Sequence, residues 1–501
     1  MDNKKTKQMI RDSFKSGGIA GIGITVSEKG KHTHFSEGYA DYKAKIPVDQ
    51  NTVFPIASCT KSFFAMAVAS LDAKGIIGLD VPIREYYSEL SMVDKYAEAN
   101  VTLRDLLCHR WGMPRHDVAW FVNLGNGLTE DELVAKVKYL PPFSSFRSKW
   151  AYTNIGYVLA GHVVKRACGK SWDTLVKDEI IKKLGIKDIS FDKKGLSKLP
   201  NKAFKYKAGA KQGEYEALPF SDYDVMGPAS CISISTAELI KWTDAQMGYY
   251  TDGMKKLNEK ALKVCHTPQM AISDTTGNDA IDMRCFGLGW GMQRYKGQKI
   301  ISHSGAFDSF LSTQFFLPDT GFSAAVAMSA TTSKQLMNAH MYALIDLHLG
   351  HDTSWDEVCK WVFPEAETGS SNEVKTFTPA LELDNYIGEY ENKGYGTISV
   401  NLKVEVKSDE KSGKQTGKKA AKQSDKQIDA KSSMLAVKIG TFELLCEHIT
   451  QNNFILRMDG IADINFPLQF IVAANGTVIG MDVMLEPMLE APIHFNIRSK
   501  K

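Results

Sequence analysis

The 501-residue chain lacks several features that mark specialised classes of protein. It contains no run of 18 apolar residues, so we expect no transmembrane helix. Its first sixteen residues are polar and no apolar segment follows the early lysines, which disfavours a secretory signal. Its net charge is only +3, and such a small charge excludes a strongly basic nucleic-acid binder. We therefore expect a cytoplasmic protein with no membrane and no nucleic-acid partner.

The cysteines also lack a pattern, because none of the eight belongs to a C-x-x-C pair and most lie inside apolar runs. Without a secretory signal, this distribution predicts buried reduced thiols in place of disulfides. Hydrophobic residues make up 43% of the chain and charged residues 24%, which excludes a wholly disordered or collagen-like protein.

The first 350 residues predict one α+β domain. Strand patterns cover 19–27, 32–39, 286–295, 298–303, 309–317 and 322–329, and helix patterns cover 58–74, 102–108, 130–139, 152–168, 235–248 and 332–349. Strands therefore lie at both ends of the segment, with helices between them. This order favours an antiparallel sheet that joins the two ends and is flanked by helices, with a helical subdomain.

The composition changes after residue 363. Residues 364–380 are polar and rich in Pro, Ser and Thr, as expected for a linker. Eight strand-like runs follow, at 386–391, 395–406, 433–438, 441–449, 453–458, 466–473, 477–485 and 491–498. We expect a large α+β domain over 1–363 and a small eight-stranded antiparallel β-barrel over 381–501. Residues 407–431 hold eight lysines and one large aliphatic residue, which predicts a disordered insert carrying the chain's slight basicity.

The sharpest chemical signal is Ser58-Cys59-Thr60-Lys61. If Ser58 opens a helix, Lys61 lies one turn later on the same face, within reach of the serine hydroxyl. A serine needs a neighbouring base to become a nucleophile, and a desolvated lysine loses its proton more easily than an exposed one. The alternative is a helix cap beside a surface lysine, because S-x-x-K is common by chance.

Two further tripeptides strengthen the catalytic interpretation. Tyr152-Thr153-Asn154 stands at the start of a predicted helix, and a tyrosine hydroxyl near a cation can act as a base. His303-Ser304-Gly305 stands at the end of a strand, where the glycine would let a substrate approach and the Ala306 amide is an oxyanion donor. Each tripeptide taken alone also fits a structural role in the core.

Together these motifs resemble the serine β-lactamase and penicillin-binding-protein superfamily in its class C-like branch, whose pattern is S-x-x-K, Y-x-N and K/H-x-G. The segments 106–114, 228–230 and 286–290 are similar to flanking motifs of the same branch. The resemblance covers about residues 15–350. Residues 383–400 look like the lipocalin-like C-terminal domain attached to some of these hydrolases.

The resemblance implies a role for each matching residue. Ser58 would be the acylated nucleophile, Lys61 would help to remove its proton, and Tyr152 would be the general base and the acid for the leaving group. Asn154 would bind substrate. The third motif, with His303 in place of lysine, would supply Ser304, Gly305 and Ala306 to substrate and oxyanion. The resemblance implies no cofactor and no metal.

The histidine in the third motif is a departure from the commoner lysine. Because histidine is mostly neutral near pH 7, a substrate carboxylate loses its fixed cation. The sequence thus favours a peptidase with D-aminopeptidase-like or carboxypeptidase-like activity on a small molecule or short peptide. A carboxylesterase or a weak β-lactamase on the same site is the alternative within this family, and a homo-oligomer is compatible with either.

Other classes fit less well. An α/β-hydrolase is disfavoured because no G-x-S-x-G elbow occurs, and H-E-x-x-H is absent. A metal site is disfavoured at His340, Asp346, His348 and His351, because their spacing fits no metal motif. A non-catalytic ligand-binding or assembly protein on this fold remains the alternative from another class. The presence of Ser58, Lys61, Tyr152 and Asn154 together argues against it.

Overall fold

The computed structural model describes residues 1–15, 18–121, 127–209, 211, 213–272, 278–330, 335–362, 379–404, 433–440, 442–457 and 465–499. The chain divides into two units by its internal contacts. Met1–Asp117 and Gly127–Gly369 make up the first unit, and Val118–Asn126 and Ser370–Lys501 make up the second. Most of the predicted linker and all of the insert at 407–431 lie outside the described residues.

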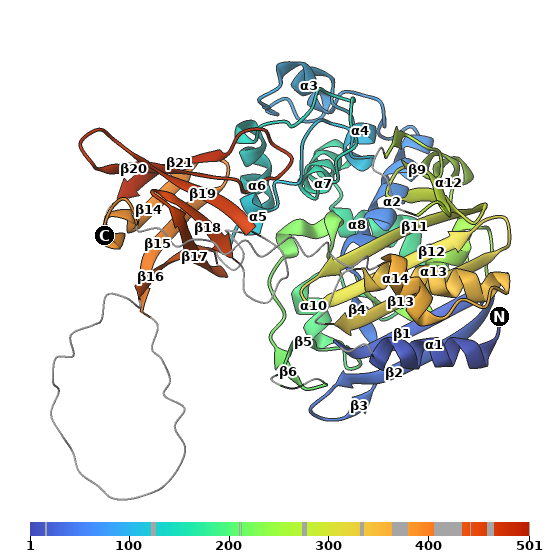
Figure 1. Ribbon diagram of the computed structural model, residues 1–501. Coiled ribbons are helices and arrows are strands. Elements are labelled where there is room, and N and C mark those ends of the chain that lie inside the picture. Colours follow the sequence, from blue (N-terminus) through green and yellow to red (C-terminus); the bar gives the residue numbers. More distant parts are fainter. Residues whose placement is uncertain are drawn as a thin grey trace, which may run out of the picture. The chain divides into compact units, whose positions relative to one another are not determined.

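The first unit is built on a nine-stranded sheet in the order β3-β2-β1-β13-β12-β11-β10-β9-β8 (Figure 1). All of its neighbouring strands are antiparallel, and β1 from the start of the chain pairs with β13. This confirms the antiparallel α+β fold. The strands are β1 (Ile19–Glu28), β2 (Lys31–Asp41), β3 (Ile46–Pro47), β8 (Met270–Ala271), β9 (Ile281–Phe286), β10 (Gly291–Tyr295), β11 (Gln298–Phe307), β12 (Phe310–Leu317) and β13 (Phe322–Ala330).

Helices cover both faces of this sheet and form a separate helical region, as Figure 1 shows. Two short two-stranded sheets, β4-β7 and β5-β6, complete the unit. The described helices are α1 (Asn3–Lys15), α2 (Thr60–Ala73), α3 (Lys95–Asn100), α4 (Leu103–Leu107), α6 (Glu130–Lys136), α7 (Ile155–Cys168), α8 (Trp172–Val176), α9 (Lys182–Leu184), α10 (Lys193–Lys198), α11 (Thr236–Gln246), α12 (Glu259–Cys265), α13 (Leu336–Leu349) and α14 (Trp355–Val362). The short strands are β4 (Val53–Pro55), β5 (Lys205–Ala208), β6 (Tyr215–Leu218) and β7 (Ser233–Ser235).

The two faces of β1 differ in chemistry because successive side chains of a strand point to opposite sides. Ile22, Ile24 and Val26 belong to the apolar core that also contains residues of α1, α13 and α14. Ser27, on the other face, donates a 2.9 Å hydrogen bond to Asp244 of α11. The sheet is therefore covered on both sides, which leaves its edges and loops to form the site.

Two sequence expectations need correction. The single strand expected over 286–295 is wrong, since β9 ends at Phe286 and β10 begins at Gly291. Gly289 lies in the turn between them at φ +74°, and a Cβ there would stand 2.8 Å from the Lys61 carbonyl oxygen. The first helix, α1, was not expected, and it forms because Met9 and Ile10 bury an apolar face against the sheet.

The second unit contains a closed antiparallel barrel in which each strand pairs with the next and β14 pairs with β21. This confirms the eight-stranded barrel. Its interior is filled by buried side chains, among them Tyr390, Phe454, Phe470, Met481 and Phe495. The unit also includes α5 (Val118–Phe121). The strands are β14 (Gly388–Asn392), β15 (Gly396–Val404), β16 (Ser433–Ile439), β17 (Phe442–Thr450), β18 (Asn453–Arg457), β19 (Asn465–Val472), β20 (Val478–Val483) and β21 (Ile493–Ser499).

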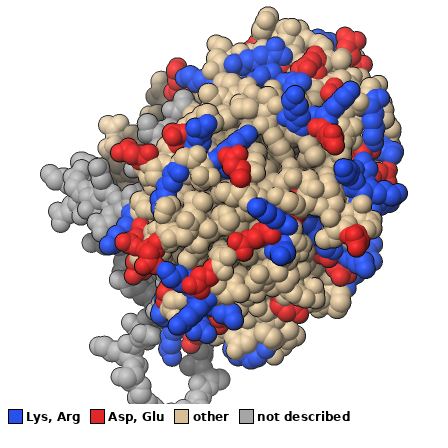
Figure 2. All heavy atoms as spheres, turned by 90° about the vertical axis from the view of Figure 1, so that its right-hand side faces the viewer, with Lys and Arg blue, Asp and Glu red and all other residues tan. Residues whose placement is uncertain are grey.

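The surface charge of the molecule is mixed in sign. On the face drawn in Figure 2, basic and acidic side chains are interspersed and no large area of one sign is visible. Among the described residues, no helix has the length and apolar character needed to span a bilayer. All eight cysteines are free thiols, and six of them are buried.

A buried carboxylate anchors the segment that follows α4. Asp105 is fully buried and accepts hydrogen bonds from the Thr102 backbone and hydroxyl, which cap the helix. Arg110 and Arg147 also donate to Asp105, at 2.6 Å and 2.7–2.9 Å. A buried charge is stable only when it is paired in this way, so Asp105 ties residues 110 and 147 to one point.

We predict that Asp105→Ala lowers the free energy of unfolding by about 3–5 kcal/mol, because it leaves two arginines without their buried partner. Asp80→Ala is the matched control, since Asp80 pairs with Arg104 but is 69% exposed, and its loss costs about 0–1 kcal/mol. Urea denaturation of the three proteins measures both values. Equal effects of the two substitutions would contradict the anchoring role.

Candidate active site

Ser58 lies in a single 3-10 turn, Ala57–Cys59, between β4 and α2. We expected Ser58 to open the helix, whereas α2 begins two residues later, at Thr60. Ala57 takes φ +43°, a left-handed conformation that is strained for a residue with a Cβ. Two side chains of β12 hold this turn, because Ser312 donates to the Ile56 carbonyl and Gln314 to the Cys59 carbonyl. The turn leaves Ser58 half-buried while Ala57 and Cys59 are fully buried.

Lys61 lies one helical turn after Ser58 and is fully buried. Its Nζ is 3.0 Å from Ser58 Oγ, 2.8 Å from Asn154 Oδ1 and 2.8 Å from the Ala229 carbonyl oxygen. The amide and carbonyl oxygens can only accept hydrogen bonds, whereas a hydroxyl can donate or accept. A neutral lysine would therefore give its two N–H bonds to those oxygens and direct its lone pair at Ser58.

The surroundings of Lys61 favour that neutral form. Burial lowers the pKa of Lys61 well below its ordinary value, and the positive charge of Arg115 lowers it further. Asp117 acts in the opposite direction through its negative charge. A lysine of this kind can accept a proton from the serine hydroxyl that it contacts.

Tyr152-Thr153-Asn154 come directly before α7, which begins at Ile155 and not, as expected, at Tyr152. The Asn154 amide uses both ends, because Oδ1 accepts from Lys61 and Nδ2 donates 2.9 Å to Asp117 Oδ1. Asp117 in turn pairs with Arg115 at 2.6 Å. Asn154 thus connects the lysine to a charged pair.

The Tyr152 ring lies beside the basic side chains of Lys61 and Arg115 and beside other rings. Lys61 Nζ is 4.9 Å and the Arg115 guanidinium carbon 5.2 Å from its centroid. Burial raises the pKa of Tyr152 well above 10, while a hydrogen bond with Ser58 lowers it in part. Its hydroxyl is therefore protonated at neutral pH, which suits a proton donor that also contacts the nucleophile.

The third motif lies on β11, beside the Ser58 turn. A Cβ at Gly305 would stand 2.1 Å from the Ile56 carbonyl oxygen and 2.9 Å from the Ser58 nitrogen, so only glycine allows this approach. Ser304 and Ala306 are half-buried neighbours of that contact, and Ser304 Oγ donates to Thr313 at 3.0 Å. The strand thereby carries the Ala306 amide to the vicinity of the nucleophile.

His303 is buried and uncharged. Burial lowers its pKa to about 3, and a proton on Lys61 would lower it further. Its Nδ1 lies 2.8 Å from the Ser304 carbonyl oxygen and must donate there, which leaves a lone pair on Nε2. Nε2 is buried and has no hydrogen-bond partner among the described residues. The neutral histidine expected from the sequence is the form that this environment favours.

The structure brings all eight predicted site residues to β11, α2 and the turns beside them, and it adds residues that the sequence did not single out. Ala229 contributes a carbonyl to Lys61, and Asp117 holds Asn154. Ala229 lies in a segment noted only for its similarity to a family motif, and Asp117 follows another such segment, 106–114. Contacts of this kind depend on the backbone path, so spacing alone does not reveal them.

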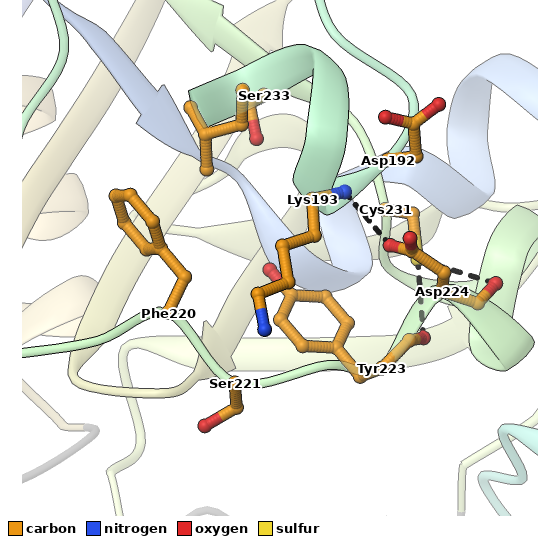
Figure 3. A pocket seen from close by; sticks show the side chains of 9 residues that line it. Asp192, Lys193, Phe220, Ser221, Tyr223, Asp224, Cys231 and Ser233 are labelled. Carbon is orange, nitrogen blue, oxygen red and sulfur yellow. Dashed lines mark hydrogen bonds between the residues drawn. The ribbon is translucent and has the colours of Figure 1, made fainter. Parts of the chain in front are cut away.

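A small pocket lies near the third motif and is lined by Asp192, Lys193, Leu196, Phe220, Ser221, Tyr223, Asp224, Cys231 and Ser233 (Figure 3). Tyr223 packs edge-on against Phe307, the last residue of β11, with 4.5 Å between ring centroids. The free space suits about one water molecule, so the pocket is too narrow for a substrate side chain in this conformation.

Glu130, Asp131 and His162 place their ligand atoms close enough to hold a metal ion. His162 Nδ1 faces both carboxylates, at 3.1 and 3.4 Å. However, Arg166 donates to Nε2 at 3.1 Å, which places the histidine proton on Nδ1, where a metal would need a lone pair. The cluster is therefore explained by hydrogen bonds between the histidine and the two carboxylates. His340 and Asp346, considered above as ligands, have separate partners in Ser13 and Lys296.

Comparison with known proteins identifies relatives across the chain. The Beta-lactamase family model matches residues 6–348. The unguisins hydrolase ungD of Aspergillus violaceofuscus is 24% identical over 429 residues, which cover 78% of this chain and 75% of that protein. The octameric penicillin-binding protein homologue of Pyrococcus abyssi shares the fold with a TM-score of 0.63 and 18% identity, over 99% of this chain and 100% of its own. The D-amino acid amidase of Ochrobactrum anthropi has a TM-score of 0.58 and 21% identity, over 70% and 98%.

We predict that His303 makes stability depend on pH. The unfolded histidine binds a proton near pH 6.5 and the folded one only near pH 3, so stability falls as the pH drops below about 6.5 and levels off near pH 3. Between pH 7 and pH 5 the loss from this group is about 2 kcal/mol. Asn at this position does not titrate.

The free energies of unfolding of wild type and His303→Asn, each measured at pH 7 and pH 5, test this. The stability advantage of wild type should shrink by about 2 kcal/mol at the lower pH. An unchanged difference would show that His303 is charged or exposed in the folded protein.

Proposed function

Because the chain belongs to the Beta-lactamase family, we propose that it is a serine hydrolase that cleaves amide or ester bonds of short peptide substrates through an acyl-enzyme on Ser58. The family and its hydrolase relatives support an enzyme of hydrolase type. One observation carries the finer proposal: the fully buried Lys61 amine, 3.0 Å from the Ser58 hydroxyl, with its other two contacts made to obligate acceptors.

Acylation begins when Ser58 Oγ attacks the carbonyl carbon of the substrate and Lys61 takes the hydroxyl proton. The backbone N–H groups of Ser58 and Ala306 hold the oxyanion that forms. The tetrahedral adduct then collapses, the bond to the leaving group breaks, and Tyr152 donates the proton that the departing amine or alkoxide needs. In the second half of the reaction water attacks the acyl carbon and gives a proton to the Tyr152 phenolate. The bond to Ser58 Oγ then breaks, and the Lys61 ammonium returns its proton to Ser58 as the acid product leaves.

The charge of the site supports substrates without a carboxylate beside the scissile bond. His303, at the position where the family pattern K/H-x-G also allows lysine, is neutral because burial lowers its pKa to about 3. Arg115 is a cation beside Tyr152, but its charge is paired with Asp117 at 2.6 Å. Amides and the N-terminal residues of peptides therefore fit the site better than carboxypeptidase substrates or β-lactams, because the latter two carry a carboxylate. The D-amino acid amidase with the same fold agrees with this preference.

Homo-oligomerisation is part of the proposal, supported by the likeness in fold, over the whole chain, to the octameric homologue of Pyrococcus abyssi. The proposed active site needs no metal and no cofactor, because Lys61 and Tyr152 handle the proton and backbone N–H groups handle the oxyanion.

We predict that a fluorophosphonate probe labels the wild-type protein covalently and that Ser58→Ala abolishes both labelling and turnover. Ser70→Ala is the matched control, because Ser70 is another buried serine of α2 and its hydroxyl donates to Glu179 at 2.7 Å. Substrate preference is read by turnover of D-amino-acid amides, p-nitrophenyl esters and nitrocefin. Folded wild type that takes no label, or label that persists in Ser58→Ala, would refute the nucleophile.

Tyr152→Phe should lower kcat by about 10²-fold or more, because phenylalanine keeps the ring contacts but has no proton to give. The stability of this variant should change little. Steady-state kinetics on the best substrate of the panel, with thermal unfolding as the check on folding, measures the effect. A kcat near that of wild type would remove Tyr152 from the proposed mechanism.

A further inference from the structure

His109 accepts two hydrogen bonds, one from the residue on each side of Tyr152. The His109 carbonyl accepts from the Ala151 N–H at 3.0 Å, and its ring Nδ1 accepts from the Thr153 N–H at 3.2 Å. The residues on both sides of Tyr152 are thus bound to one residue. The His109 ring also packs against the Tyr152 ring, with 4.5 Å between centroids and 40° between planes.

The hydrogen bond from Thr153 determines the protonation state of His109. A backbone N–H can only donate, so Nδ1 must offer a lone pair and the ring proton must lie on Nε2. A proton on Nδ1 would point at the Thr153 N–H and break the contact. The setting agrees, because His109 is 1% exposed and burial lowers its pKa well below 6.5.

The backbone of His109 is itself held in an unusual conformation. It takes φ +62°, the left-handed region that is uncommon for residues with a side chain. The next residue, Arg110, bonds to Asp105 through both its backbone N–H and its side chain. Asp105 therefore fixes the backbone beside His109, and His109 in turn fixes the backbone on both sides of Tyr152. Strain of this kind persists only where surrounding contacts enforce it.

We infer that His109 is a positioning residue for the reaction: its neutral ring and its carbonyl together hold the Tyr152 hydroxyl where the leaving group accepts a proton. This inference rests on the proposed function. It assigns His109 a part in catalysis through Tyr152, without contact with substrate. A misplacement of about 1 Å in a reacting group can cost about 10²-fold in rate, so loss of the hydrogen bond from Thr153 to Nδ1 should be visible in kinetics.

Three substitutions separate the two ends of the imidazole. In His109→Asn the amide oxygen can take the place of Nδ1 and accept from Thr153, whereas the longer His109→Gln places its amide near the Nε2 position. His109→Ala removes both. His340→Ala is the control for loss of a buried ring, because His340 is fully buried and bonds to Leu336 and Ser13, outside the site.

The experiment compares kcat/KM on two esters of one acyl group, a p-nitrophenyl ester and an alkyl ester. A p-nitrophenolate leaves without a proton, whereas an alkoxide needs one from Tyr152. We expect His109→Gln and His109→Ala to lower kcat/KM by about 10²-fold on the alkyl ester and by less than about 10-fold on the p-nitrophenyl ester. His109→Asn should stay within about threefold of wild type on both, and His340→Ala should leave the ratio of the two esters unchanged.

Equal losses on the two esters would overturn the inference, as would an Asn variant as defective as the Gln variant or a wild-type rate in His109→Ala. Fluorophosphonate labelling of Ser58 in wild type is measured in parallel. Labelled, active wild type with unselective His109 variants refutes the positioning role alone. Wild type that neither labels nor turns over either ester refutes the proposed function, and the inference with it.

Discussion

The burial of one amine is the constraint on which the rest of the site depends. Lys61 has no access to solvent, so its Nζ must find its hydrogen-bond partners inside the protein or lose its charge. Two partners are oxygens that only accept, and the third is the Ser58 hydroxyl. This arrangement stabilises a neutral amine aimed at a serine, which is the condition that a weak nucleophile needs.

That constraint draws distant parts of the chain together. The Ala229 carbonyl comes from the loop before β7, the Asn154 amide from the turn before α7, and Ser58 from the strained turn before α2. β11 then approaches the same turn so closely that Gly305 leaves no room for a side chain. Antiparallel pairing of β11 with β12 fixes this approach, because Ser312 and Gln314 on β12 bind the carbonyls around Ser58. The covered nine-stranded sheet is thus the rigid support of the site.

Much of this could be predicted from the sequence because it is local. The barrel strands are short strand-like runs separated by turn residues, so the eight strands were predicted within a few positions. The motif residues Ser58, Lys61, Tyr152 and Asn154 carry their chemistry in their side chains and spacing. The start of α2 at Thr60 and the turn inside 286–295 were missed, because both depend on a positive φ, at Ala57 and Gly289, that periodicity does not encode.

The supporting residues could not be predicted for a different reason. Asp117, Ala229 and His109 act through a carboxylate, a carbonyl and a ring acceptor whose partners are distant in sequence, and any residue type offers a carbonyl. Residue type therefore does not predict which partners these groups contact, because the backbone path of the fold determines them.

The charge of the site depends on the burial and the backbone contacts of two histidines. His303 and His109 are both buried and neutral, and each has one ring nitrogen engaged with the backbone on a segment that carries a motif. A lysine at position 303 would bring a second amine close to Lys61, and the two amines would then compete for protons within the site. With histidine there, the positive charge beside Tyr152 is the Arg115 guanidinium, which Asp117 balances. In the proposed mechanism the site combines a neutral Lys61, a protonated Tyr152 and no net cation facing the acyl group, which suits neutral amide and ester bonds.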